Sequence, residues 1–236
     1  MKIFASKSRI VTSLVYFSVL HLCFFAAYAQ EKIQPFERNA ISKEGKILYT
    51  ERGAVSHQKG TNDTIKIKYF SEVVGSVNPH TVAFDYNMVK SKSGYKVDMI
   101  AGMDPFLTRI NDNVSRTYQG DDLYYPNNMK VGQVLDNASG VFYLNIDKGA
   151  LIIFNKIEIT NRVVQSIESV NYDKQMLTAF VVRYNYKYVS GFKETITRTV
   201  EETVTEWFVP EYGSIRQERV GADEIRKTTL ANSLKN

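Results

Sequence analysis

LIIFNKIEITNRVVQSIESV, residues 151–170, and TAFVVRYNYKYV, residues 178–189, decide the fold of this chain. In the first stretch the odd positions up to Ile159 are apolar except for Asn155, and the even positions from Lys156 to Thr160 are polar. An apolar residue at every second position predicts a half-buried strand, because successive side chains point to opposite faces of a sheet. In the second stretch one face carries Phe180, Val182, Tyr184, Tyr186 and Tyr188, and the other carries Arg183, Asn185 and Lys187.

Further segments with alternating or β-branched residues extend this prediction along the chain. Gly60 and Asn62-Asp63 predict a loop over 55–63. Residues 223–230 could form a last strand or a short helix, and we favour the strand. The remaining strands are expected at 46–52, 64–74, 81–89, 95–103, 131–135, 141–146, 194–209 and 214–220. The sequence therefore predicts an all-β fold, an antiparallel meander whose strongly curved sheet forms a half-barrel or a sandwich.

One short helix is expected near residues 105–112. Asp104 can accept hydrogen bonds from the free N–H groups of a helix start, and Pro105 fits the first helical position. Phe106, Leu107 and Ile110 share one face of such a helix. This face would be buried if the helix plugged the mouth of the sheet or barrel.

The N-terminus has the three parts of a secretory signal peptide. Lys2, Lys7 and Arg9 precede an apolar run over 10–25, and Ala26-Ala27-Tyr28-Ala29 follows. We expect cleavage after Ala29, which leaves Gln30 as the new N-terminus. The alternatives are an uncleaved anchor, for which the run is shorter than the roughly 20 residues of a membrane span, and a lipoprotein modified at Cys23, which Leu22 disfavours because it is not small.

These features predict four segments along the chain. They are a signal peptide over 1–29, a polar leader over 30–45, a single β domain over 46–231 and a C-terminal tail over 232–236. Removing the signal peptide from 236 residues leaves 207. A chain of this length suits one domain that buries about 70% of its unfolded surface. No stretch after residue 29 is apolar and long enough to be a transmembrane helix.

The charge balance gives no sign of a nucleic-acid partner. The whole chain has 30 basic and 25 acidic residues, a net charge of +5. The expected signal peptide contains three basic and no acidic residues, so the mature balance is 27 against 25, or +2. The basic residues are scattered, whereas a nucleic-acid surface clusters them. The only cysteine, Cys23, leaves with the signal, so neither a disulfide nor a cysteine metal site is expected.

The chemistry-bearing residues show no catalytic or metal-site spacing. His57 and His80 are far apart and have no companion ligands at zinc-site spacing. No serine lies in a G-x-S-x-G motif. Asn111-Asp112-Asn113 and Asp121-Asp122 offer oxygen ligands for Ca²⁺, but they miss the helix–loop–helix spacing, and turns commonly contain such residues. We therefore expect no catalytic residue, no cofactor and no bound metal.

The row of Tyr184, Tyr186 and Tyr188 is the candidate ligand or partner face, because tyrosine combines an apolar ring with a polar tip. The alternative is a core row, since such residues favour strands in any case. In residues 194–209 the threonines predict a solvated face. On the opposite, otherwise apolar face, Arg198 and Glu202 indicate that the sheet is only partly covered.

Several landmarks resemble those of a known family. They are Val97-Asp98-Met99, Tyr125-Pro126 with Met129, Val131 and Gly132, Asn161-Arg162-Val163-Val164 with Glu168, Ala179-Phe180, and Trp207-Phe208-x-Pro-x-x-Gly213 with Ile215 and Glu218. In their order and spacing, over roughly residues 45–231, the chain resembles the TapB-like family. These are small exported β proteins of Gram-negative bacteria, and they overlap a domain family of unknown function. The usual small glycine before the phenylalanine is missing from Leu177-Thr178-Ala179-Phe180.

The resemblance implies an all-β protein of the periplasm or the outer-membrane periphery, with an envelope partner of tetratricopeptide-repeat type. It supplies no catalytic residues. Asn161 and Arg162 interrupt the apolar alternation as a bend or bulge would. We therefore expect an exported, non-enzymatic binding or structural protein. One alternative is a carrier or chaperone for a lipid-like apolar ligand in the curved sheet. Another is an enzyme whose Asp, Glu and Tyr side chains converge across strands.

Overall fold

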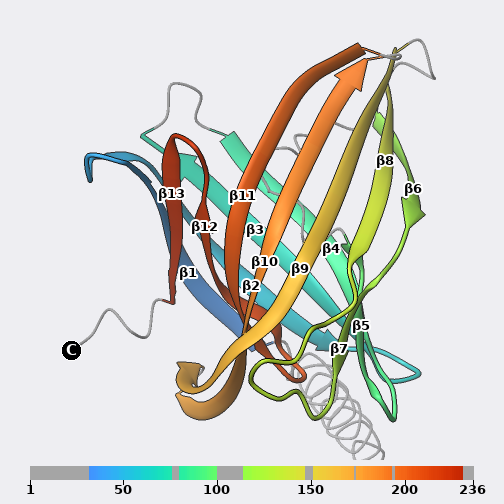
Figure 1. Ribbon diagram of the computed structural model, residues 1–236, viewed down its shortest axis with the longest axis vertical. Coiled ribbons are helices and arrows are strands. Elements are labelled where there is room, and N and C mark those ends of the chain that lie inside the picture. The colour runs from blue at the N-terminus through green and yellow to red at the C-terminus, as the bar shows by residue number, and fades with distance from the viewer. Residues whose placement is uncertain are drawn as a thin grey trace, which may run out of the picture. The chain divides into compact units, whose positions relative to one another are not determined.

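The computed structural model describes residues 32–75, 80–99, 114–146, 151–172, 174–192 and 195–230. Nearly all of them belong to the compact unit Ile33–Asn236. Their regular elements are strands (Figure 1): β1 (Lys32–Ser42), β2 (Ile47–Lys59), β3 (Thr64–Val74), β4 (His80–Lys90), β5 (Gly94–Val97), β6 (Val114–Gly120), β7 (Leu123–Pro126), β8 (Ala138–Ile146), β9 (Leu151–Tyr172), β10 (Gln175–Phe192), β11 (Thr195–Val209), β12 (Gly213–Val220) and β13 (Glu224–Leu230).

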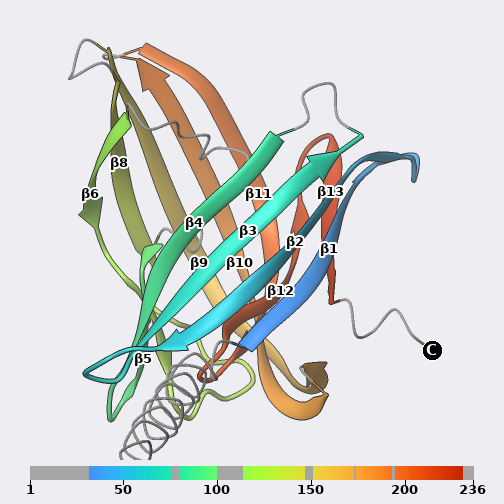
Figure 2. The same ribbon diagram turned by 180° about the vertical axis from the view of Figure 1, so that it is seen from behind.

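The described strands form one sheet of 13 strands in the order β6-β8-β9-β10-β11-β12-β13-β1-β2-β3-β4-β5-β7. The sheet is open, because β6 lies at one end of this order and β7 at the other. It curves strongly, so that β8–β11 lie on one side of it and β1–β4 on the other (Figures 1 and 2). The predicted all-β fold with a curved antiparallel sheet is therefore confirmed. The described residues contain no helix with the length and hydrophobicity that a membrane span requires.

The two ends of the sheet are connected by a very short segment of chain. Gly120, the last residue of β6, pairs with Gly140 in β8. Leu123, the first residue of β7, pairs with Val97 in β5. Only Asp121 and Asp122 separate β6 from β7. The chain therefore brings the two sheet ends together where β6 stops and β7 starts.

The main core lies between the two sides of the curved sheet. It includes Ile67 and Met88 from β3 and β4, and Ile157, Val182 and Phe208 from β9, β10 and β11. These side chains share one face of their strands, which we call the inner face. Its burial removes a large apolar area from water and is the main favourable contribution to folding. A second, smaller cluster on the opposite face contains Tyr172, Ala179, Val181, Trp207, Val209 and Ile215.

The expectation of a polar leader over 30–45 is wrong where the structure describes this segment, because residues 32–42 form β1. β1 pairs with β13 from Phe36↔Leu230 to Ser42↔Glu224. Every second side chain of β1 is buried, namely Gln34, Phe36, Arg38 and Ala40. Two of these four residues are polar, so the sequence of β1 shows no apolar residue at every second position, and the strand was not predicted.

Two other local predictions are also wrong. The segment 55–63 was expected to be a loop, but β2 continues to Lys59 and pairs with β3. The turn is confined to the following residues, where Asn62 and Asp63 have positive φ. The segment 131–135 was expected to be a strand, but it is a turn with the single bridge Val134↔Val163. Tertiary pairing overrides local propensity in both places.

The predicted strand over 223–230 is confirmed as β13. The predicted bulge is confirmed as well, because Asn161 has a φ of 55° and two residues of β9 lie opposite Tyr184 of β10. The expected signal peptide with its cleavage site at Ala29 and Gln30, the short helix near 105–112 and the tail over 232–236 lie outside the described residues.

The close approach of β5 to β7 predicts a specific effect of Gly94→Ala. A Cβ at Gly94 would lie 2.3 Å from the Tyr125 carbonyl oxygen and 2.9 Å from Pro126 Cα. We expect this substitution to lower the free energy of unfolding by about 1–3 kcal/mol, the usual cost of overpacking. Gly221→Ala is the control, because its Cβ would meet nothing closer than 3.7 Å. Equal urea-unfolding midpoints for the two variants would contradict the described pairing.

Candidate functional site

The tyrosines predicted as a ligand or partner face lie in the core. Tyr184, Tyr186 and Tyr188 are each 2% exposed on the inner face of β10. The Tyr188 hydroxyl donates to Asn155 Oδ1 at 2.5 Å. Burial raises the pKa of Tyr184, and the charge of Glu206 adds to this effect. Their burial matches the core alternative, and a binding role for this row stays a prediction.

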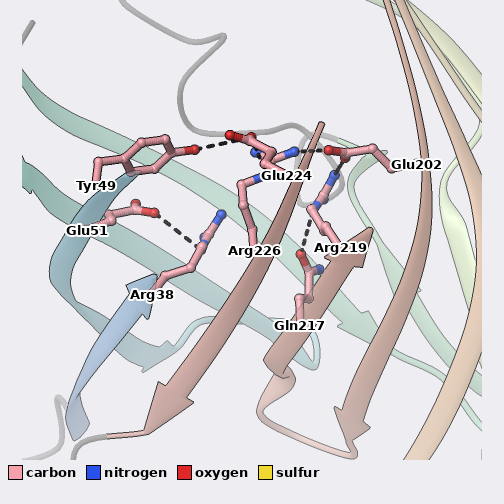
Figure 3. Close-up of polar contacts among 8 residues, drawn as sticks. All are labelled: Arg38, Tyr49, Glu51, Glu202, Gln217, Arg219, Glu224 and Arg226. Carbon is pink, nitrogen blue, oxygen red and sulfur yellow. Dashed lines mark hydrogen bonds and ion pairs between the residues drawn. The ribbon is translucent and has the colours of Figure 1, made fainter. Parts of the chain in front are cut away.

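Five of the buried charged residues lie on the inner face of five adjacent strands (Figure 3). We call them the buried charge belt: Glu202 of β11, Arg219 of β12, Arg226 of β13, Arg38 of β1 and Glu51 of β2. Each is at most 7% exposed. Buried ions must be paired, because removal from water penalises an isolated charge heavily. We therefore treat the belt as the candidate site.

Glu202 connects the strands at one side of the belt. Its Oε2 lies 3.3 Å from Arg219 Nη1, and its Oε1 accepts from Arg226 Nη2. The Arg219 guanidinium also stacks over the Tyr186 ring, with Cζ 4.7 Å from the ring centroid. Arg219 Nε donates to Gln217 Oε1 at 3.2 Å. Two guanidinium groups therefore share one carboxylate.

Glu51 organises the other side of the belt. Arg38 Nε lies 3.2 Å from Glu51 Oε2. The Tyr69 hydroxyl and Ser71 Oγ donate to Glu51 Oε1 at 2.5 and 2.6 Å. The Tyr69 hydroxyl in turn accepts from Arg38 Nη2 at 2.9 Å. Burial raises the pKa of Tyr69 well above its usual value, so this hydroxyl stays protonated and can donate.

The belt reaches solvent at Glu224. The Glu224 side chain is 31% exposed, and its Oε1 lies 3.4 Å from Arg226 Nε. The Tyr49 hydroxyl donates to the same oxygen at 3.4 Å. Figure 3 shows Tyr49, Glu224 and Arg226 side by side at this rim.

A second polar group, which we call the seam cluster, consists of Tyr125, Arg162, Glu206 and Phe208. The Tyr125 hydroxyl donates to Glu206 Oε2 at 2.9 Å. The Tyr125 ring stacks on Phe208 with centroids 3.9 Å apart and an interplanar angle of 2°. The Arg162 guanidinium lies over the same ring, 4.6 Å from its centroid, and donates to the Asp136 carbonyl at 2.8 Å. These contacts hold β7, at one end of the sheet, against β9 and β11.

Two cavities lie among the described residues, one of them polar and the other very small. One, of about 410 Å³, lies over β9, β10 and β11 and is lined by Glu158, Thr160, Asn185, Lys187, Glu201 and Thr203. Ion pairs at its border join Lys156 to Glu158 at 2.6 Å and Lys187 to Glu201 at 2.8 Å. Another, beside Tyr184 and Glu206, measures about 10 Å³, which is room for one water molecule.

The residues weighed as metal ligands do not form a metal site within the described chain. The described residues contain no group of three or more His, Cys, Asp and Glu side chains that could hold a metal ion. His57 is buried, and its Nε2 lies 2.8 Å from the Tyr212 carbonyl oxygen. His80 begins β4. The candidate calcium ligands Asn111-Asp112-Asn113 lie outside the described residues.

Asp121 and Asp122 lie in the short link between β6 and β7, where the Tyr118 hydroxyl donates to the Asp121 carbonyl at 2.5 Å. Burial raises the pKa of Tyr118 to about 12, and the charges of Asp122, Asp121 and Asp98 contribute. Burial also raises the pKa of Asp98, which accepts from the Asn87 amide at 2.8 Å.

Sequence reasoning missed most of the belt. Arg38 lies in the segment that was interpreted as a leader, and Glu51, Arg219 and Arg226 carried no motif. Glu202 alone was noted, as a charge on an otherwise apolar face. The available signal was positional, because Arg38 is two residues from both Phe36 and Ala40 and must share their face in a strand.

Comparison with known proteins gives a family and a fold. The family described as DUF3108-like matches residues 33–224. A candidate exported protein with a YmcC-like fold from Bacteroides fragilis NCTC 9343 is 18% identical, with a TM-score of 0.51 over 85% of this chain and 94% of that chain. A candidate lipoprotein from Parabacteroides distasonis ATCC 8503 is 17% identical, with a TM-score of 0.55 over 85% and 95%. At these identities the likeness shows the fold alone. No curated protein matches this chain by sequence.

The seam cluster predicts the effect of Tyr125→Phe. The substitution removes the donor to the buried Glu206 carboxylate and keeps the ring stacked on Phe208. We expect the free energy of unfolding to fall by about 1–3 kcal/mol, because a buried acceptor loses its partner. Tyr143→Phe, at a half-buried position of β8, should change it by less than about 0.5 kcal/mol. Chemical denaturation measures both free energies of unfolding. An unchanged value for Tyr125→Phe would contradict the hydrogen bond from Tyr125 to Glu206.

The raised pKa of Tyr118 predicts a loss of stability at high pH. Between pH 10 and about 12 the unfolded chain ionises this hydroxyl while the folded chain keeps its proton. The unfolded state then binds fewer protons, so stability should decrease as pH rises through this window. Ultraviolet titration of the wild type minus Tyr118→Phe should show one tyrosine titrating near pH 12. A difference spectrum with a midpoint near pH 10 would contradict this environment.

Proposed function

The chain belongs to the DUF3108-like family, and from this premise we propose that it is an exported, non-enzymatic protein of the cell envelope that acts by binding or as a structural component. The observation that carries the proposal is the shared fold of two proteins described as a candidate exported protein and a candidate lipoprotein. The basic, apolar and small-residue segments of the first 29 residues support the same location. The periplasm or the outer-membrane periphery is the proposed compartment.

The finer proposal is a protein partner of tetratricopeptide-repeat type, as the resemblance to the TapB-like family implies. The interior around the tyrosine row offers little room for an apolar ligand. Tyr184, Tyr186 and Tyr188 are packed in the core, and the enclosed cavity beside Tyr184 has room for one water molecule. The buried charge belt makes part of the inner face ionic. A polar ligand or a protein partner therefore suits the described surfaces better than a lipid chain.

Export can be tested with the full chain in a Gram-negative host. We expect the envelope fraction to contain a processed chain that begins at Gln30, as measured by intact-mass spectrometry. Ala29→Arg should block processing, because signal cleavage needs a small residue before the cut. Ala26→Ser is the control and should be processed normally. An unprocessed wild-type chain in the cytoplasm would overturn the proposed location.

The partner can be tested by photo-cross-linking in the same host. A photoreactive residue at Asn185, on the exposed face of β10, should yield a cross-linked complex with a helical-repeat protein. The same residue at the buried Tyr186 position is the control and should yield none. Mass spectrometry identifies the captured protein. Capture of unrelated envelope proteins in equal amounts at both positions would count against a specific partner.

A further inference from the structure

The charge balance of the buried charge belt depends on a residue at its solvent-exposed rim. The belt contains three guanidinium groups, Arg38, Arg219 and Arg226, but only two carboxylates, Glu51 and Glu202. The third carboxylate in contact with it is Glu224, whose side chain is 31% exposed. Buried arginines keep their charge, so they need a full complement of anions. Glu224 supplies one of these anions to Arg226.

Glu224 is held far more loosely than the buried carboxylates. Both of its contacts, with Arg226 Nε and the Tyr49 hydroxyl, are 3.4 Å long and use the same oxygen, Oε1. Glu51, in contrast, accepts hydrogen bonds of 2.5 and 2.6 Å and lies 3.2 Å from Arg38. A partly exposed ion pair with long contacts contributes little free energy. An anion from solvent could replace this carboxylate at low cost.

The rim is also the side from which an anion can enter. Glu224 directly follows the turn between β12 and β13, whose Gly221 amide donates to the Glu224 carbonyl at 3.0 Å. This backbone contact keeps the turn in place whether or not the side chain lies over Arg226. Tyr49 is half-buried on β2, and Figure 3 shows its hydroxyl directed at the Glu224 carboxylate. The Tyr49 hydroxyl and the buried Arg226 Nε therefore both face the partly exposed Glu224 carboxylate.

We propose that this rim is a binding site for an oxyanion, a carboxylate or a phosphate group, which replaces the Glu224 carboxylate on Arg226 and the Tyr49 hydroxyl. Arg226 Nη2 is already bonded to Glu202, so Arg226 Nε and the Tyr49 hydroxyl are the two groups that face the oxygens of the anion. Glu51 stays bound to Arg38, and Glu202 stays bound to Arg219 and Arg226. The inference rests on the proposed binding function and names the ligand chemistry. Phosphate binding is measured with purified protein, so its absence would refute the site and leave the proposed export untouched.

Isothermal titration calorimetry with orthophosphate, at an ionic strength held constant with chloride, tests the site. We expect wild type to bind phosphate and Glu224→Gln to bind it at least about threefold more tightly, because the competing carboxylate is gone. Glu201→Gln, which removes an exposed carboxylate in the 410 Å³ cavity, is the matched control and should leave the affinity unchanged. The proposal would be overturned if Glu224→Gln and Glu201→Gln bound phosphate with equal affinity. It would also be overturned if titration with chloride alone gave the same heats as titration with phosphate.

A second variant tests the guanidinium geometry. Arg226→Lys keeps the charge, but a single ammonium group cannot bond Glu202 and also present a second donor at the rim, so phosphate should bind about tenfold more weakly. Circular dichroism tests whether this variant is folded. If it is not, the phosphate affinity of Glu224→Gln decides whether the site exists.

Vesicles separate the two sources of a phosphate group. Binding to phosphatidylcholine vesicles only when they contain phosphatidylglycerol, and more strongly for Glu224→Gln, identifies a lipid headgroup. Binding of free orthophosphate without such vesicle binding identifies a soluble ligand. If the protein binds neither the vesicles nor free orthophosphate, the proposed site is refuted.

Discussion

The contact of Tyr125 with β11 is the constraint on which the rest of the sheet depends. An open sheet of 13 strands has two edges, and β7, a strand of only four residues, forms one of them. So short a strand cannot be held by its ladder alone. Tyr125 fixes it through a stacked ring, a buried carboxylate and an overlying guanidinium. With β7 in place, Leu123 and Val97 cover the inner apolar side chains of the opposite strands.

The buried charge belt explains how the middle of the sheet tolerates an ionic interior. Each side of the belt is organised around one buried carboxylate. Glu51 serves β1, β2 and β3, and Glu202 serves β11, β12 and β13. Pairs of this kind seldom stabilise a fold beyond what apolar residues would give, because desolvation offsets much of the attraction. Their strong geometric demands favour one strand register, since a shift by one residue would expose every partner.

The strands that could be predicted from the sequence are those whose inner faces are apolar. β10 has Phe180, Val182 and three tyrosines on one face, and the predicted alternation matches its burial. The bulge at Asn161 followed from an interruption of the same kind of pattern. β1 was not predicted, because Gln34 and Arg38 occupy inner positions, and the partners of Arg38, Glu51 and Tyr69, lie on other strands. The belt escaped prediction for the same reason, since charge pairing between distant strands leaves no local pattern.

The pairing of β1 with β13 joins the first and last described strands of the sheet. A ribosome or a translocation pore delivers the chain from its N-terminus. The edge of β1 that pairs with β13 therefore has no partner strand until residue 230 has emerged. Contacts between such distant residues slow folding, because a long loop must be closed before they form. During that interval the partly made sheet presents a strand edge that invites pairing with other chains. The Arg38 side chain stays hydrated until Glu51 of β2 has been delivered, so this ion pair can form long before β13 reaches the edge of β1.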